Sequence, residues 1–251
     1  MMFREYLMAG TMEEALEANK KKSSAVLAGN LWLKMEDKQA GTAIDLSRLG
    51  LSAIEETESG FVIGAMVTLR DIETHEGLNA YTCGAVKESV RHIVGTQFRN
   101  CATVGGSIFG RFGFSDVLTC FLAMETSVRL AARGEVPLRQ FAAEEKDRDI
   151  LTHLIVKKTP MTMAYQSMRN EAVDFPVVAV AAARRGGSLY ISVGARPSRA
   201  AVIEVKESEA PSPEELAARF TYGTNMRASA EYRRHVAGVL IGRALRQMEE
   251  R

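Results

Sequence analysis

The chain has 251 residues, a formal net charge of +1 and 46% hydrophobic residues, which is the composition of an ordinary globular protein. The charge balance argues against a nucleic-acid partner, because binding a polyanion leaves a basic excess. No apolar run reaches the roughly 18 residues of a membrane span, and the three cysteines show neither a disulfide framework nor the spacing of a metal site. We therefore expect a cytoplasmic protein with no metal ligands of its own.

The N-terminal part of the chain begins with a helix followed by a short strand. Thr11 with Glu14 has the pattern of a capping box and predicts a helix over residues 11–21. The lysine run 20–22 follows the end of this helix, where positive charge complements the helix dipole. The apolar stretch SSAVLAGN then predicts a strand that ends at Gly29-Asn30.

The middle of the chain mixes strands with short helices. The segment LSAIEETESGFVIGAMVTL predicts two strands around the turn Ser59-Gly60. Thr68 is placed to cap a short helix, and residues 82–95 predict a second helix with one apolar face. Beyond the next glycines, the pattern predicts a helix over residues 116–124 and a hairpin over residues 127–141.

From about residue 161 the sequence changes to strands followed by helices. Residues 175–205 predict three successive strands, the first two joined at Gly186-Gly187. Ser212 and Glu215 form a capping box around a proline at the first helical position. Residues 229–248 then have the apolar spacing of a helix. The chain is therefore predicted to be an α+β protein with two mixed portions and a C-terminal layer of sheet and helices.

The common sequence signatures of nucleotide binding and catalysis are absent. There is no G-x-G-x-x-G or G-x-x-x-x-G-K-[ST] motif for a nucleotide, no H-E-x-x-H pair for a metal and no G-x-S-x-G nucleophile elbow. We therefore expect any catalysis to come from a bound cofactor, which the protein positions and tunes.

Two glycine-bearing turns, each directly after an apolar run, remain as candidate binding elements: VLAGNLWL at residues 26–33 and ATVGGSIFG at residues 102–110. Successive backbone N–H groups in such turns form concave sites for anions such as phosphate. Glycine also lets the anion's oxygens approach the main chain. Taken alone, each turn is more often an ordinary surface loop, but two turns drawn together would hold one pyrophosphate between them.

Residues in and around these turns resemble a known family. QFRNCATVGGSIFGRFGFSD, residues 97–116, resembles the pattern I/F-R-N-x-A-T/S-V/I-G-G-N-I followed by S-D, and VLAGNLWLK resembles the first FAD loop A/V-G-G/N-T-x-L/I. Both patterns belong to the FAD-binding subunits of the molybdenum hydroxylases, such as the medium subunits of xanthine dehydrogenases and carbon monoxide dehydrogenases. The C-terminal stretch RASAEYRRHVAGVLIGRAL is similar to the closing S-x-E-Y-R element of the same family.

This resemblance implies a fold and a set of domains. The fold is the FAD-binding PCMH-type α+β fold, in which two α/β subdomains bind FAD between them. The first subdomain would span residues 1–56 and the second residues 57–160. Residues 161–251 would form a C-terminal domain with a three-stranded antiparallel sheet and helices.

The resemblance also implies residues that bind FAD. The first loop would wrap the diphosphate with main-chain groups; it comprises Val26, Leu27, Ala28, Gly29, Asn30, Leu31, Trp32 and Leu33. The residues expected at phosphate and ribityl oxygens are Thr103, Gly105, Gly106 and Ser107, and those expected at polar atoms farther along are Gly110, Ser115 and Asp116. Leu151, or its neighbour Ile150, would lie near the flavin ring. No catalytic residue and no metal ligand is implied in this chain.

Four residues at three places depart from the family pattern. Ser107 stands in place of the more usual Asn, and Phe112 with Gly113 stands where Ser or Asp followed by Pro is common. Gln166 lies in a neighbourhood where many relatives carry a lysine. Two other residues have open interpretations: Arg99 is either a structural ion-pair partner or a ligand, and Trp32 either covers the cofactor or fills the core.

The implied function is that of an FAD-carrying electron-transfer subunit of a molybdopterin-dependent hydroxylase or dehydrogenase. The implied partners are a [2Fe–2S] small subunit, a molybdopterin-binding large subunit and an acceptor such as NAD+, in a dimer of heterotrimers. Two alternatives stay open. The first alternative is a self-contained FAD oxidoreductase of the same fold. The second, which the departures from the pattern leave open, is a flavin-free assembly subunit.

Overall fold

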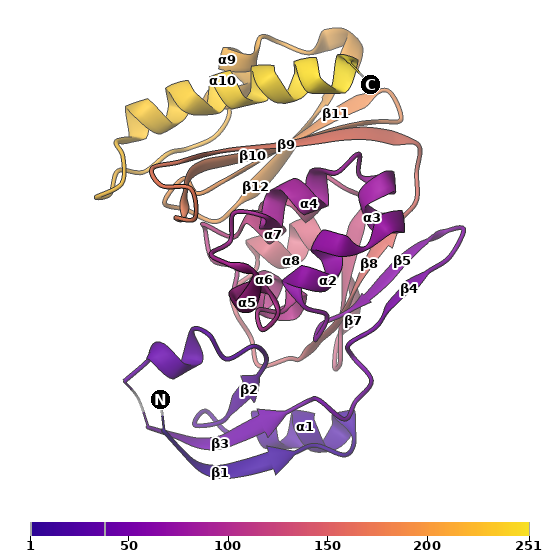
Figure 1. Cartoon of the computed structure of the whole chain (residues 1–251), viewed down its shortest axis with the longest axis vertical. Coiled ribbons are helices and arrows are strands. Elements are labelled where there is room, and N and C mark those ends of the chain that lie inside the picture. Colours follow the sequence, from indigo (N-terminus) through magenta and orange to yellow (C-terminus); the bar gives the residue numbers. More distant parts are fainter. Residues whose placement is uncertain (1, 38, 251) are drawn as a thin grey trace.

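The computed structural model of the protein describes residues 2–37 and 39–250. Three portions follow one another along the longest axis, each built around its own sheet (Figure 1). The N-terminal portion lies at one end, the C-terminal sheet and its helices lie at the other, and the second portion lies between them. No helix in the described ranges is long and apolar enough to cross a membrane.

The N-terminal portion is a small parallel sheet with one helix. Its central strand is β3 (Gln39–Asp45), which pairs in parallel with β1 (Met2–Met8) and β2 (Ala25–Leu27). Helix α1 (Met12–Asn19) connects β1 to β2 and begins as predicted, with the Thr11 hydroxyl accepting from the Glu14 N–H. The sequence patterns did not predict β1, because its alternation mixes exposed apolar and charged side chains. A 3-10 turn (Leu33–Met35) follows the first glycine loop.

The second portion contains a five-stranded antiparallel sheet in the order β4-β5-β8-β6-β7. Its strands are β4 (Ile54–Glu56), β5 (Gly60–Gly64), β6 (Thr126–Leu130), β7 (Gly134–Pro137) and β8 (Leu151–Lys157). Its helices are α2 (Leu69–Thr74), α3 (Glu76–Tyr81), α4 (Ala85–Val90), α5 (Thr96–Arg99), α6 (Val104–Phe109), α7 (Asp116–Leu122) and α8 (Leu138–Ala143). The predicted hairpin and the predicted cap at Thr68 are both present.

The single helix predicted over residues 82–95 is shorter than expected. Cys83 and Gly84 have positive φ values of 51° and 76°, which a right-handed helix cannot continue through. Val94 also has a positive φ, of 49°, and closes the segment at its other end. Only α4 between these points is helical, and Val86 and Val90 on its apolar face are fully buried, as the pattern indicated.

The C-terminal sheet has four strands, so the prediction of a three-stranded sheet was wrong. Antiparallel strands β10 (Pro176–Arg185), β11 (Ser188–Gly194) and β12 (Ala201–Lys206) are those predicted, and β9 (Met161–Arg169) adds an edge. The sequence of β9, MTMAYQSMR, has weak strand propensity. It becomes a strand because β10 supplies its hydrogen-bond partners while α4 and α10 pack on it.

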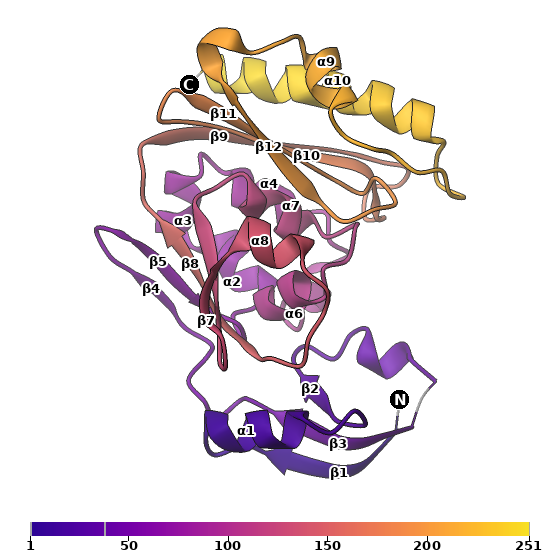
Figure 2. The same cartoon turned by 180° about the vertical axis from the view of Figure 1, so that it is seen from behind.

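The C-terminal sheet is covered on both faces (Figure 2). Helices α9 (Pro213–Ala218) and α10 (Ala230–Glu249) pack on one face, and α4, α7 and α8 of the second portion lie on the other. Alternate residues of β10 therefore enter two different cores: Val178 and Val180 face the C-terminal helices, whereas Ala179 and Ala181 face the second portion. Because this contact buries a continuous apolar surface, the second portion and the C-terminal portion form one packed unit.

We propose three domains that follow the predicted division 1–56, 57–160 and 161–251, with the first boundary moved from residue 56 to residue 53. Strand β4 pairs with β5 and not with the N-terminal sheet, so residues 54–56 join the sheet of the second domain. The N-terminal portion attaches to the second through a smaller core in which Ile44 and Leu46 meet Ile150.

Candidate functional site

The two glycine loops, from different portions of the chain, lie in contact. A Cβ atom added to Gly29 would stand 2.0 Å from the carbonyl oxygen of Cys101 and 3.0 Å from Cα of Ala102. A Cβ added to Gly106 would stand 3.8 Å from Cβ of Ala28. The expectation that the two turns are drawn together in the folded chain is therefore confirmed. Glycine is required at position 29 because the backbones approach so closely.

The first loop presents unused hydrogen-bond donors. Strand β2 ends at Leu27, and Asn30 adopts a left-handed conformation with φ of 58°. In the part of the chain that the structure describes, the backbone N–H groups of residues 29–32 donate to no protein atom, and the next bond runs from Lys34 N–H to Asn30 O at 3.1 Å. Gly29 and Leu31 are half-buried, so their N–H groups need a partner, whereas Asn30 and Trp32 are exposed. A run of such groups beside a left-handed residue is a suitable site for an anion.

The second loop differs, because its N–H groups are used inside the fold. Thr103 caps α6, with its hydroxyl accepting from Gly106 N–H at 3.1 Å, and Gly105 N–H donates to Ala65 O at 2.8 Å. A Cβ on Gly105 would stand only 2.6 Å from that same carbonyl oxygen, so packing against the chain at Ala65 explains this glycine. Gly106 is open toward the first loop, where a ligand could approach it.

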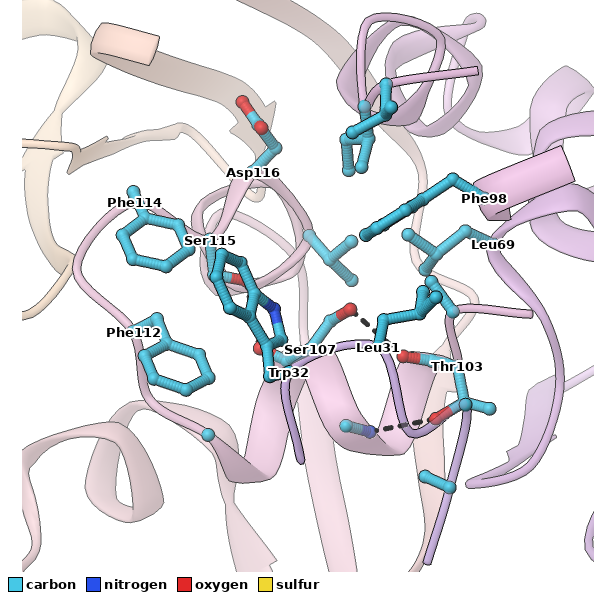
Figure 3. Close-up of a pocket in the computed structure, with 18 of the residues that line it drawn as sticks. Leu31, Trp32, Leu69, Phe98, Thr103, Ser107, Phe112, Phe114, Ser115 and Asp116 are labelled. Carbon is cyan, nitrogen blue, oxygen red and sulfur yellow. Dashed lines mark hydrogen bonds between the residues drawn. The ribbon is translucent and has the colours of Figure 1, made fainter. Parts of the chain in front are cut away.

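A cavity of about 400 Å³ lies beside the meeting point of the loops (Figure 3). A second cavity of about 290 Å³ adjoins it, and the two share lining residues from both loops, among them Val26, Ala28 and Gly106. All sixteen residues that the sequence predicted for the cofactor line one cavity or both. Those on the first cavity are Val26, Ala28, Gly29, Asn30, Leu31, Trp32, Leu33, Thr103, Gly106, Ser107, Gly110, Ser115 and Asp116. Those on the second are Val26, Leu27, Ala28, Leu33, Gly105, Gly106 and Leu151.

Hydroxyl groups hold the segment from Thr103 to Asp116 together. The Ser107 hydroxyl donates to Thr103 O at 2.9 Å, and the Ser115 hydroxyl donates to Ser107 O at 2.9 Å. Ser115 also caps α7 by accepting from Leu118 N–H at 3.1 Å. This chain of bonds fixes the wall of the first cavity, and the same hydroxyls lie along its lining.

Asp116 is engaged with the protein. It is 5% exposed, and its carboxylate accepts from the Tyr165 hydroxyl at 2.5 Å and from Arg169 Nη2 at 2.6 Å. Burial raises the pKa of Asp116, and the Arg169 guanidinium opposes that shift. In Figure 3 its carboxylate points away from Ser107 and Trp32. The carboxylate that was expected at polar atoms of the cofactor thus has partners within the chain, the Tyr165 hydroxyl and the Arg169 guanidinium.

Four aromatic rings form a wall of the first cavity. Trp32 lies 6.0 Å from Phe112, 5.8 Å from Phe114 and 5.7 Å from Phe175 between ring centroids, and the last pair is stacked. Trp32 is 42% exposed, so the interpretation that it fills the core was wrong. We call these four residues the aromatic wall. Its flat apolar surfaces suit a planar ring, since offset-stacked and edge contacts between aromatic groups are favourable.

Several residues that line the first cavity were not predicted as site residues. Phe98 precedes the second loop, whereas Arg169 and Phe175 come from the C-terminal portion. Phe98 stands inside the pattern QFRNCATVGG, so the sequence could have indicated it. Arg169 and Phe175 carry no local signal, because they reach the cavity only through the packing of β9 on α4 and of β10 on α7. Gln166, which the sequence singled out as a departure from the family pattern, lines neither cavity. It donates to Gln247 Oε1 of α10 at 2.7 Å.

Arg99 is explained by structure alone. Its guanidinium donates to both carboxylate oxygens of Glu73, at 2.8 and 3.1 Å, with both side chains nearly buried. The structural interpretation of this residue is therefore confirmed. Among the described residues, no group of three or more histidine, cysteine or acidic side chains is arranged to hold a metal ion.

Comparison with solved structures gives the same fold over nearly the whole chain. A carbon monoxide dehydrogenase from Hydrogenophaga pseudoflava, which lacks the Mo-pyranopterin moiety of the molybdenum cofactor, matches with a TM-score of 0.86 and 21% identity, covering 100% of this chain and 98% of that one. Reconstituted CO dehydrogenase from Oligotropha carboxidovorans matches with a TM-score of 0.85 and 23% identity, covering 98% of both chains. Quinoline 2-oxidoreductase from Pseudomonas putida 86 gives a TM-score of 0.81 and 16% identity, covering 98% of this chain and 96% of that one.

Sequence comparison finds a relative and a family. The uncharacterized protein YgfM of Escherichia coli (strain K12) is 24% identical in an alignment of 249 residues that covers 96% of this chain and 94% of YgfM. A family model described as the FAD binding domain in molybdopterin dehydrogenase matches residues 1–159, the two portions that carry the glycine loops. Because this match spans more than half of the 251 residues, the chain belongs to the FAD-binding family of the molybdopterin dehydrogenases, an oxidoreductase family whose cofactor is FAD.

Proposed function

We propose that this chain is the flavin-carrying electron-transfer subunit of a molybdopterin-dependent hydroxylase or dehydrogenase. In this proposal it takes electrons from a [2Fe–2S] partner and passes them to NAD+ or another acceptor, within a dimer of heterotrimers that includes a molybdopterin-binding subunit. The likeness to carbon monoxide dehydrogenases and to quinoline 2-oxidoreductase over at least 98% of the chain supports this proposal. The cytoplasm remains the predicted location, and the three cysteines are unbridged.

The residues at the two loops fit FAD. A dinucleotide has a doubly charged pyrophosphate between two ring systems, and here the free N–H groups of residues 29–32 lie where two cavities adjoin. The aromatic wall offers apolar surface in the first cavity and Leu151 offers it in the second. We propose that the pyrophosphate binds the first loop and that each cavity takes one ring system. The contact of the two loops is the observation that carries this assignment.

FAD, once bound, supplies the one-electron and two-electron redox chemistry. The chain itself binds, orients and shields. The first loop would neutralise the phosphate charge with backbone dipoles, and the Thr103, Ser107 and Ser115 hydroxyls would line the path between loop and rings. The aromatic wall would exclude water from one ring system. Asp116 with Arg169 would place a nearly neutral ion pair beside the cavity. No acid or base is required of these residues.

The single tryptophan makes the proposal testable. Because Trp32 lines the first cavity and is the only tryptophan in the sequence, its fluorescence reports on that cavity. We expect titration of the flavin-free chain with FAD to quench this fluorescence and to saturate at one FAD per chain. Chain purified with its native partners should contain flavin, molybdenum and iron, and its flavin should be reduced by the partners' substrate.

Three outcomes contradict the proposal. A chain that neither retains nor takes up FAD would be the flavin-free assembly subunit. An isolated chain that reduces a small organic substrate without partners would be the self-contained oxidoreductase. A native complex in which molybdenum and iron are absent would remove the electron source on which the proposal depends.

A further inference from the structure

The two walls of the second cavity are joined by one pair of side chains. Arg148, from the loop before β8, donates through Nε to the backbone oxygen of Asn19 and through Nη2 to Asn19 Oδ1 at 3.0 Å. The side-chain amide of Asn19 in turn donates a hydrogen bond to Arg148 O at 2.8 Å. Asn19 is 5% exposed, and both residues line the second cavity. We call the two adjoining cavities, in which we propose that FAD binds, the FAD groove. Hydrogen bonds in both directions therefore join the N-terminal and second portions at the edge of this groove.

Arg148 also holds the segment that leads into the first glycine loop. Its Nη2 atom donates to Lys21 O at 2.8 Å and to Ser24 O at 3.0 Å, and β2 begins at the next residue. Helix α1 ends at Asn19 with no basic residue in its last turn. Arg148 therefore supplies donors to the carbonyl end of this helix and adds its positive charge to that of the lysine run 20–22 that follows. The nearby Lys20 is instead paired with Glu17.

The residue after Arg148 is anchored to the second portion. The neighbouring Asp149 is 8% exposed, and its carboxylate accepts from the N–H groups of Ala132, Arg133 and Ile150 at 2.9, 3.0 and 2.7 Å. Ile150 enters the small core shared by the first two portions. The Arg148 backbone is therefore held by the second portion, while its side chain binds residues 19–24. The location of residues 19–24 thus depends on that of the second portion.

We propose that Arg148 and Asn19 form a clasp that sets the distance between the first glycine loop and the second, and thereby the affinity of the groove for FAD. Both are positioning residues. This inference rests on the proposed function for its ligand, but the clasp itself is a property of the folded chain. It differs from a direct ligand contact because the guanidinium is directed at four protein oxygens, none of them acidic.

The test compares the variants Arg148→Ala, Asn19→Ala and their combination, with FAD as the probe. Each single change should raise the Kd for FAD about tenfold, equivalent to about 1.4 kcal/mol. The Kd of the double variant for FAD should not exceed the higher of the two single-variant values, because both changes open the same clasp. Arg148→Lys keeps the charge but not the planar donor set, so its Kd should lie between those of the wild type and the alanine variant.

The matched control is Arg199→Ala. Arg199 also donates to two backbone carbonyls, Ala143 O and Glu144 O, both at 2.7 Å. It joins the C-terminal and second portions and lines neither cavity. Its removal should leave the Kd for FAD within about twofold of the wild type. Hydrogen exchange without FAD provides a second readout: the amides of residues 25–33 should exchange faster in Arg148→Ala and Asn19→Ala, but not in Arg199→Ala.

The outcomes separate the clasp from the proposed function. Wild-type FAD affinity and wild-type exchange in Arg148→Ala would overturn the clasp. If Arg148→Ala binds FAD more weakly than the wild type while Asn19→Ala binds it equally well, Arg148 contacts the ligand directly. That result would also overturn the clasp. If the wild type binds no FAD, the proposed function fails, and the exchange experiment alone decides the clasp.

Discussion

At the scale of single residues, the buried charges of this chain serve mainly to hold segments in place. Asp116 belongs to the S-D pair that resembles a cofactor-binding motif, yet its carboxylate pairs with Arg169 and Tyr165 of the C-terminal strand β9. Arg169 also donates to Asp174 O, at the base of the loop that carries Phe175. Asp116 and Arg169 together thus connect the start of α7 to Asp174, the residue before Phe175 of the aromatic wall. A sequence motif identified Asp116, but only the fold shows what it touches.

Glu73 and Arg99 form another buried pair, directly before the second glycine loop. Burial raises the pKa of Glu73, but the hydrogen bonds from Arg99 and Arg70 outweigh burial and hold that pKa below its ordinary value. A carboxyl group whose pKa is lowered by folding stabilises the protein above its unfolded pKa, and this stabilisation is lost as the pH falls through the folded pKa.

We predict that Glu73→Gln lowers the free energy of unfolding by about 3 kcal/mol at pH 7, because it leaves a buried guanidinium without its counter-charge. The deficit should shrink as the pH falls below the ordinary glutamate value of 4.5. Urea denaturation at neutral and acidic pH measures both values. The control Glu17→Gln breaks an exposed pair with Lys20 and should cost less than about 1 kcal/mol. If Glu73→Gln lowered the free energy of unfolding equally at both pH values, the lowered pKa of Glu73 would be contradicted.

At the scale of elements, the two glycine loops resemble each other in sequence but differ in physical role. The first is a connection with free N–H groups and a left-handed residue, whereas the second is the capped start of α6 with its donors already used. The glycines differ as well. Gly29 admits the backbone of the other loop, and Gly105 admits the chain at Ala65. Together they allow three backbone segments to converge at the groove.

We predict that Gly29→Ala destabilises the protein by about 1–3 kcal/mol, because the new methyl group would stand 2.0 Å from Cys101 O and force the loops apart. FAD affinity should fall in the same variant. Gly10→Ala is the control, since its Cβ would meet only Glu14 Oε2, at an ordinary 3.6 Å. Denaturation and FAD titration of both variants check this prediction. A Gly29→Ala protein with wild-type stability would show that the loops separate without cost.

At the scale of the whole molecule, the groove lies between a small N-terminal portion and a larger packed unit. The second and C-terminal portions share an extensive core, whereas the N-terminal portion is attached through a few apolar residues, the loop contact and the hydrogen bonds of Arg148. A ligand that touches both sides adds contacts across the weaker junction. FAD binding and the attachment of the N-terminal portion should therefore support each other.

We predict that FAD at a hundredfold excess over its Kd raises the free energy of unfolding by about 2.7 kcal/mol, because only the folded chain brings both loops together. FMN lacks the second nucleotide half and reaches one cavity only, so it should stabilise the chain less at equal concentration. Thermal or urea denaturation with each flavin measures the difference. A midpoint that FAD does not move would contradict the assignment of the groove.

The local patterns of the sequence determined the α+β class, the helix caps at Thr11, Thr68 and Ser212, and the two glycine loops, because capping and turn chemistry act over a few residues. They did not reveal β9, whose strand conformation depends on its neighbours. Only the tertiary structure decided that the loops meet, that Trp32 stands among three phenylalanines and that Arg148 reaches α1. Each of these contacts joins residues far apart in the chain, and nothing in the local sequence encodes them.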